Sequence, residues 1–64
     1  MGAAMTEAEA RKAAEARGWR LEKRDKAYRL IDAGTGTVVG GNWLQPDDEY
    51  FGLSLDDVVN ALEP

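Results

Sequence analysis

The 64-residue sequence contains no cysteine and no histidine. Without cysteine the chain can form no disulfide bond and has no thiol nucleophile. Without histidine as well, the common zinc sites and the Ser-His and Cys-His catalytic pairs are excluded. We therefore expect a protein that is not an enzyme and that has no cofactor or metal. A chain this short forms one domain with a thin margin of stability, because it buries only about 60% of the surface that its unfolded form exposes.

Large apolar side chains are also scarce. Apolar residues make up 44% of the sequence, but ten of them are alanine. We expect the core to be built from Trp19, Leu21, Tyr28, Leu30, Ile31, Val38, Val39, Trp43, Leu44, Tyr50, Phe51 and the apolar face of the C-terminal segment. Such a core has little to set against the roughly 1–2 kcal/mol of backbone entropy that each ordered residue loses. Pairing with a second copy, as a homodimer, would enlarge it.

Long hydrophobic runs are absent too. No apolar run approaches the roughly 18 residues of a membrane-spanning helix, and the N-terminus lacks the basic segment and apolar stretch of a signal peptide. We expect a cytoplasmic protein without membrane contact. Residues 1–5 are expected to form a mobile extension, and residues 6–64 a single domain.

The first element is expected to be a helix from Glu7 to Arg17. Thr6 and Glu9 have the spacing of a capping box, and Gly18 is placed to end the helix in the left-handed conformation. The helix is rich in alanine on one face. It can therefore dock closely against a sheet, although it buries little area there.

From Trp19 onwards the apolar residues alternate with a period of two, which is typical of strands with one covered face. Two strands are expected at Trp19–Arg24 and Ala27–Asp32, with a tight turn between them. The turn sequence 33–36 then leads to a third strand at residues 37–39. The sequence predicts an antiparallel meander of three strands.

The chain then changes direction. Gly40 and Gly41 predict a bulge or bend, after which residues 42–44 pack in a new direction, and residues 45–52 form a loop. Ser54 is expected to cap a second helix with an apolar stripe formed by Leu55, Val58, Val59 and Leu62. The expected fold class is therefore α+β, with the meander covered by the C-terminal helix. The N-terminal helix is expected on the same face or across the sheet edge.

Charge is segregated along the chain. All eight basic residues lie between positions 11 and 29, where only three acidic residues oppose them, so this segment carries +5 while residues 30–64 carry −7. One interpretation is a nucleic-acid surface, for which the candidates are Arg20, Lys23, Arg24, Lys26 and Arg29. The other is that the two halves attract each other or a second copy of the chain.

Two further clusters lie in or near the loop. Asp47, Asp48 and Glu49 could hold a hard cation, but a calcium loop spreads its ligands over about a dozen residues, so a solvated loop is favoured. Trp43, Tyr50 and Phe51 belong to the core or to an interface. We expect Trp43 in the core. Tyr50 and Phe51 are adjacent and should face different ways, so one of them is expected to contact a partner or a second copy.

Four stretches of the sequence resemble short uncharacterised proteins of actinobacteria and their phages, including mycobacteriophage-like proteins. The stretches are Arg17–Lys23, Tyr28–Asp32, Val38–Gly40 and Phe51–Val58. The resemblance implies a phage-derived protein and carries no activity or site residue with it.

These observations favour a small non-catalytic protein-interaction module. It would bind a protein partner or a second copy through Trp43, Tyr50 and Phe51. The alternative is a nucleic-acid-associated accessory protein that binds through the basic segment 11–29.

Overall fold

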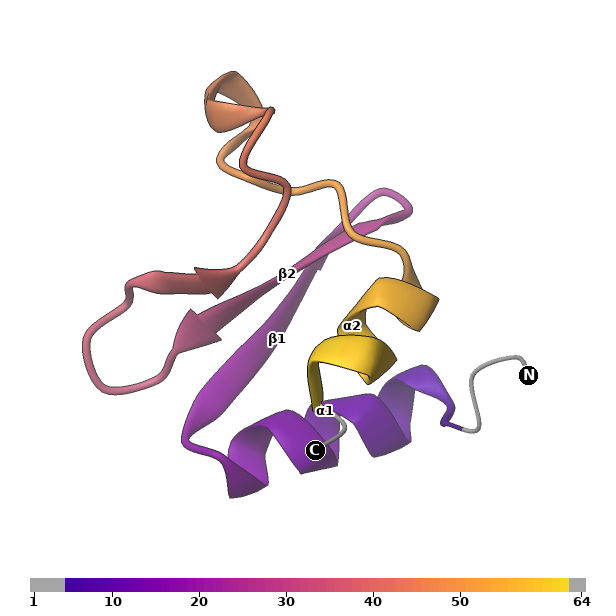
Figure 1. Cartoon of the computed structure of the whole chain (residues 1–64). Coiled ribbons are helices and arrows are strands. Elements are labelled where there is room, and N and C mark those ends of the chain that lie inside the picture. Colours follow the sequence, from indigo (N-terminus) through magenta and orange to yellow (C-terminus); the bar gives the residue numbers. More distant parts are fainter. Residues whose placement is uncertain (1–4, 63–64) are drawn as a thin grey trace.

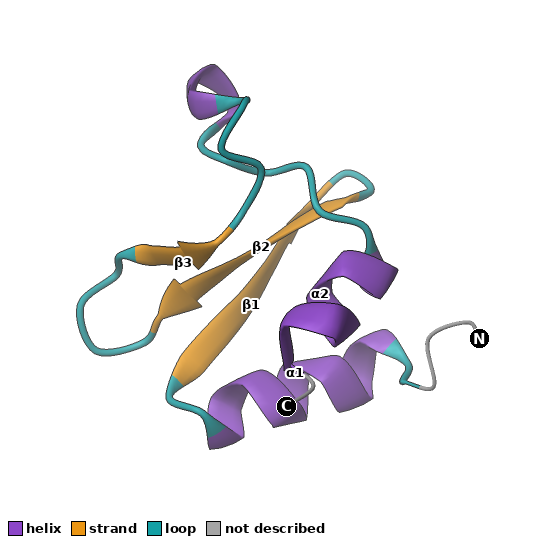
Figure 2. Cartoon of the chain, in the orientation of Figure 1, coloured by secondary structure: helices purple, strands orange, loops and turns teal. Residues whose placement is uncertain are grey.

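The computed structural model describes residues 5–62. Its elements are, in chain order, α1 (Glu7–Ala16), β1 (Trp19–Arg24), β2 (Ala27–Asp32), β3 (Val38–Gly40), the short 3₁₀ helix η1 (Pro46–Asp48) and α2 (Leu55–Leu62). The strands form an antiparallel sheet in the order β1-β2-β3, and both helices pack on the same face of it (Figure 1, Figure 2). The expected α+β fold, α-β-β-β-α, is therefore confirmed.

Helix α1 begins at the expected capping box. The backbone N–H of Glu9 donates to the Thr6 hydroxyl at 3.2 Å, and the backbone N–H of Thr6 donates to the Glu9 carboxylate at 2.9 Å. The helix ends at Ala16, one residue earlier than expected, because Arg17 is the C-cap. Gly18 follows in the left-handed conformation, with φ of +77°.

Strands β1 and β2 have the bounds that their alternation predicts. Leu21 lies opposite Leu30, and both side chains are fully buried beneath the helices. The turn that joins the two strands contains Asp25 in the left-handed conformation, with φ of 56°. This hairpin places the alternate side chains of each strand, Arg29 among them, on the face that no helix covers.

Strand β3 begins one residue later than expected and contains a bulge. Leu30 lies opposite Gly40 and Ile31 lies opposite Val38, so Val39 is an extra residue without a partner on β2. The side chain of Val39 is 40% exposed. Its expected place in the core was wrong, because the bulge removes it from the register that would have buried it.

Alanine brings α1 close to the sheet. Ala10 and Ala14 are its buried residues, and their small side chains let the helix backbone lie near the strands. The main core comprises Ala10, Ala14, Leu21, Tyr28, Leu30, Val58 and Leu62. Met5 packs partly buried against this core, so it lies with the domain. Residues 1–4 of the expected extension fall outside the described residues.

Helix α2 has its own reciprocal cap and a link to α1. The Ser54 hydroxyl accepts a hydrogen bond from the backbone N–H of Asp57, whose carboxylate accepts one from the backbone N–H of Ser54, both at 3.1 Å. The expected apolar stripe is buried apart from Leu55, which is partly buried. At the other end, the Arg17 guanidinium donates to the Leu62 carbonyl, where a cation is favoured.

A polar cluster joins the first turn of α1 to the sheet. Glu7 accepts hydrogen bonds from the Tyr28 hydroxyl at 2.9 Å, from Lys23 Nζ at 3.2 Å and from the Arg11 guanidinium at 3.0 Å. These donors hold the pKa of Glu7 below its usual value, with the Tyr28 bond contributing most. Burial, and next its bond to Glu7, raise the pKa of Tyr28. The cluster is stabilised when Glu7 is ionised.

The lowered pKa of Glu7 predicts a pH-dependent contribution to stability. Ionised Glu7 stabilises the fold above the pKa that this group has in the unfolded chain, and that contribution is lost as the pH falls through the lower pKa of the folded state. We expect Glu7→Gln to lower the free energy of unfolding near pH 7, with a difference from wild type that shrinks on acidification to about pH 3. Urea denaturation at both pH values measures it.

Glu15→Gln is the matched control, because Glu15 lies on the same helix and makes no ion pair within residues 5–62. A Glu7→Gln effect of equal size at both pH values would contradict the prediction, as would an equal effect of the Glu15 substitution.

Candidate functional site

Residues 42–52 form a loop that extends beyond the sheet and away from α1 (Figure 1, Figure 2). We call this segment the projecting loop. Backbone hydrogen bonds close it on itself: Asn42 donates to the Tyr50 carbonyl at 2.8 Å, Gln45 to the Asn42 carbonyl at 3.0 Å, and Tyr50 to the Gln45 carbonyl at 3.0 Å. The chain then returns to the sheet, where Leu53 and Tyr28 exchange backbone hydrogen bonds of 2.9 and 3.1 Å. The loop is therefore an ordered part of the fold.

Glycine is required where the two arms of the projecting loop meet. A Cβ atom added at Gly41 would lie 2.8 Å from the Tyr50 carbonyl oxygen, and one added at Gly52 would lie 2.8 Å from the Cβ atom of Asn42. Both distances are shorter than a carbon atom tolerates. Glu49 and Tyr50 are both left-handed, with φ of 56° and 66°. The loop holds these unfavourable conformations because its contacts with the sheet compensate for them.

Phe51 anchors the projecting loop between two arginines. Its side chain is only 6% exposed, and the guanidinium groups of Arg24 and Arg29 each lie 4.4 Å from the centre of its ring. Both arginines stand on the sheet face opposite the helices, where Arg29 also bonds Glu22 at 2.7 Å. Stacking of this kind contributes about 0.5–2 kcal/mol per pair. We call Phe51 with Arg24 and Arg29 the arginine clamp.

The same guanidinium groups bind the acidic part of the loop through their edges. Arg24 contacts the carboxylates of Asp48 at 2.5 Å and Glu49 at 2.9 Å, and it also donates to the Asp48 carbonyl at 2.6 Å. Arg29 donates to the Glu49 carbonyl at 2.8 Å. The acidic half of the chain therefore docks on the basic strands. Attraction between the two halves was one of the interpretations of the charge pattern.

The five residues considered for nucleic-acid binding do not share one surface. Arg24 and Arg29 belong to the arginine clamp, and Lys23 points to the helix side, where it bonds Glu7. Arg20 lies 3.9 Å from Glu22, and Lys26 is exposed in the turn between β1 and β2. A continuous basic face would require the clamp to open.

Two of the three acidic residues of the loop hold it to the sheet. Asp48 and Glu49 bind Arg24, and within residues 5–62 no group of three or more acidic, histidine or cysteine side chains is arranged to hold a metal ion. In the same range no helix is long and apolar enough to cross a membrane.

Two large apolar side chains of the projecting loop face solvent. Trp43 is 58% exposed and Leu44 is 90% exposed. Their expected places in the core were wrong, because the loop carries them past the end of the sheet, where no other part of residues 5–62 covers them. Tyr50 is partly buried, and its ring lies 5.4 Å from that of Trp43 at an angle of 57°. Of the adjacent pair Tyr50 and Phe51, the tyrosine is therefore the one that reaches the surface.

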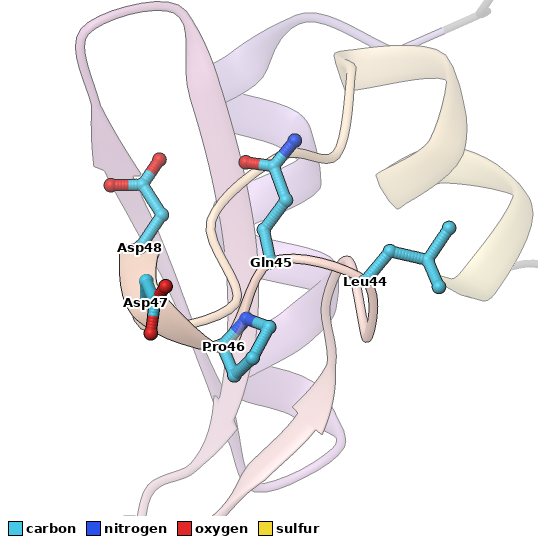
Figure 3. Close-up of a pocket in the computed structure, with 5 residues that line it drawn as sticks. All are labelled: Leu44, Gln45, Pro46, Asp47 and Asp48. Atoms are coloured by element: carbon cyan, nitrogen blue, oxygen red, sulfur yellow. The ribbon is translucent and has the colours of Figure 1, made fainter.

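Next to these side chains the loop is hollowed. An open hollow of about 430 Å³ is lined by Leu44, Gln45, Pro46, Asp47 and Asp48. Figure 3 shows Leu44 at one end of the hollow and the two carboxylates at the other, with Gln45 and Pro46 between them. Sequence reasoning missed Leu44 and Pro46 as site residues. The available indication was that Leu44 belongs to no periodic segment and stands between a Gly-Gly pair and a Pro-Asp-Asp turn.

The arginine clamp predicts that Arg24 controls the order of the loop. We expect Arg24→Ala to lower the free energy of unfolding by about 1–2 kcal/mol, and to speed hydrogen exchange at the amides of Asp48, Tyr50 and Phe51. Both effects follow from the loss of its stacking and ion pairs. Denaturant titration and amide exchange by NMR measure them. Arg20→Ala is the control, because Arg20 stands on the same strand face and has, within residues 5–62, one ion pair of 3.9 Å; equal effects in the two variants would refute the assignment.

Comparison with known proteins assigns no relative to the chain. No family model matches it, and no curated protein or solved structure matches it either. The resemblance to actinobacterial and phage proteins therefore stays a prediction. Conclusions about function rest on the geometry of the projecting loop and of the sheet that holds it.

Proposed function

We propose that the protein is a small, non-catalytic, cytoplasmic protein-interaction domain that contacts its partner through the projecting loop. The observation that carries this proposal is the exposure of Trp43 and Leu44 on a segment that is itself firmly anchored. The chain has few large apolar residues, and two of them lie next to each other at the surface of this loop, where they add little to the core. Exposed apolar groups of this kind are characteristic of interaction sites.

The anchoring of the loop favours binding. Association costs free energy when side chains and loops must be ordered, so a loop that is already ordered binds more tightly for the same contacts. Trp43 is oriented in advance by its contact with Tyr50. Tryptophan and tyrosine are among the residues that contribute most to interfaces. Of the three residues expected to contact a partner, Trp43 and Tyr50 lie at the surface, and Phe51 supports them from below.

Several observations support binding over catalysis. The pKa of Glu7 is lowered and the pKa values of Lys23 and Tyr28 are raised within a cluster whose hydrogen bonds join α1 to the sheet, so these shifts belong to the fold. The hollow of the projecting loop is lined by carboxylates, an amide and apolar groups, and it holds no serine, threonine or lysine nucleophile. Such a lining suits recognition of another molecule.

The proposal predicts that the double substitution Trp43→Ser and Leu44→Ser abolishes partner capture while the fold persists. Because both side chains are exposed, we expect the free energy of unfolding to change by less than about 1 kcal/mol. Wild type and variant would be used for affinity capture from an actinobacterial lysate. A protein retained only by wild type would then be purified and titrated against both by calorimetry.

Val39→Thr is the matched control, since Val39 is an exposed apolar residue of β3 outside the loop. Equal affinity of wild type and the double variant for the purified partner would contradict the proposal. Salt-sensitive retention on heparin that is lost in an Arg20→Ala, Lys26→Ala variant would favour the nucleic-acid alternative.

A further inference from the structure

We propose that the projecting loop recognises a segment of a partner protein in which a lysine or arginine adjoins a large apolar residue. This inference rests on the proposed function and names the chemistry of the partner. We call residues 43–48 the crest of the projecting loop. The inference follows from the order of their side chains, because apolar groups and carboxylates lie next to each other there.

The apolar part of the crest comes first along the chain. Trp43 and Leu44 are exposed, and Leu44 and Pro46 form the apolar part of the hollow. Asp47 and Asp48 complete the lining at its other end (Figure 3). When one part of a ligand covers Leu44 and fills the hollow, the adjoining part of the ligand therefore lies against the carboxylates.

The carboxylates of the crest are available to a ligand. Asp47 makes no side-chain hydrogen bond or ion pair within residues 5–62 and is exposed. Asp48 is 59% exposed at its side chain and uses Oδ1 for Arg24, while its Oδ2 makes no hydrogen bond within residues 5–62. A lysine or arginine placed here gains a charge-assisted hydrogen bond.

The balance of charge around the loop is negative. The projecting loop contains three carboxylates and no basic residue, and the sequence has no lysine or arginine after Arg29. The two guanidinium groups of the arginine clamp offset only part of this charge, and Arg29 also pairs with Glu22 at 2.6 Å. A basic segment is therefore attracted to the crest, and a phosphate backbone is repelled.

Charge and size also disfavour a second copy meeting the loop crest to crest. Two such crests would bring like charges together. Trp43 and Leu44 offer at most about 400 Å² between them, whereas a stable interface takes roughly 800 Å² from each partner. The open hollow of about 430 Å³ offers room for a single side chain of a short segment. The crest thus fits a short segment better than a matching copy of itself.

A displayed library of random peptides of about 12 residues tests this proposal. Peptides are selected on wild type and depleted on the Trp43→Ser, Leu44→Ser variant, and the enriched sequences are synthesised. We expect them to carry a lysine or arginine within two positions of Leu, Phe or Trp. We expect Asp47→Asn to weaken their binding about two- to fivefold and to reduce its salt dependence. Asp56→Asn is the control, because it removes the same charge from α2, outside the projecting loop, and it should leave the affinity unchanged.

The outcomes separate this inference from the proposed function. Peptides that require Trp43 and Leu44 but lack basic residues, or that bind Asp47→Asn as well as wild type, would overturn the inference and leave the proposed function standing. If no peptide depends on Trp43 and Leu44, both fail. Sedimentation that shows a dimer for wild type and a monomer for the double variant would assign the crest to a second copy and overturn the inference.

Discussion

The packing of Phe51 between Arg24 and Arg29 is the contact on which the arrangement of this protein depends. Two helices cover one face of the sheet, and within residues 5–62 no third α-helix is present to cover the other face. The arginine clamp covers part of that face with charged residues, because a guanidinium group is apolar above its plane and polar at its edge. The guanidinium groups of Arg24 and Arg29 pack on the Phe51 ring, and their N–H groups donate to Glu49 of the loop. One set of side chains thus supplies both burial and ion pairing.

The scarcity of large apolar residues explains why the apolar core lies on only one face of the sheet. On the helix side, Ala10 and Ala14 let α1 lie close to the sheet, in a core that also contains Leu21 and Leu30. With the core closed in this way, Trp43 and Leu44 are not needed for it, and they remain at the surface.

Local features of the sequence predict the fold well, and they fail where contacts between distant residues decide. The capping box of Thr6 and Glu9 and the alternation in β1 and β2 are settled within a few residues, so these elements were predicted closely. The exposure of Trp43 and Leu44 was not, because it depends on Arg24 binding Asp48, 24 residues away. Periodicity cannot show that contact. Likewise, the glycine pair predicted a bulge, but the register of β2 against β3 placed it at Val39.

The arginine clamp also links the two functions that the sequence left open. Nucleic acid could engage Arg24 and Arg29 only if they released Asp48, Glu49 and Phe51, since the same guanidinium edges would have to bind phosphate. That release would free the projecting loop and expose Phe51. Binding of nucleic acid through Arg24 and Arg29 and binding of a partner through an ordered loop therefore exclude each other in one molecule. The closed clamp favours binding through the loop, because opening the clamp would lose the stacking on Phe51 and the ion pairs together.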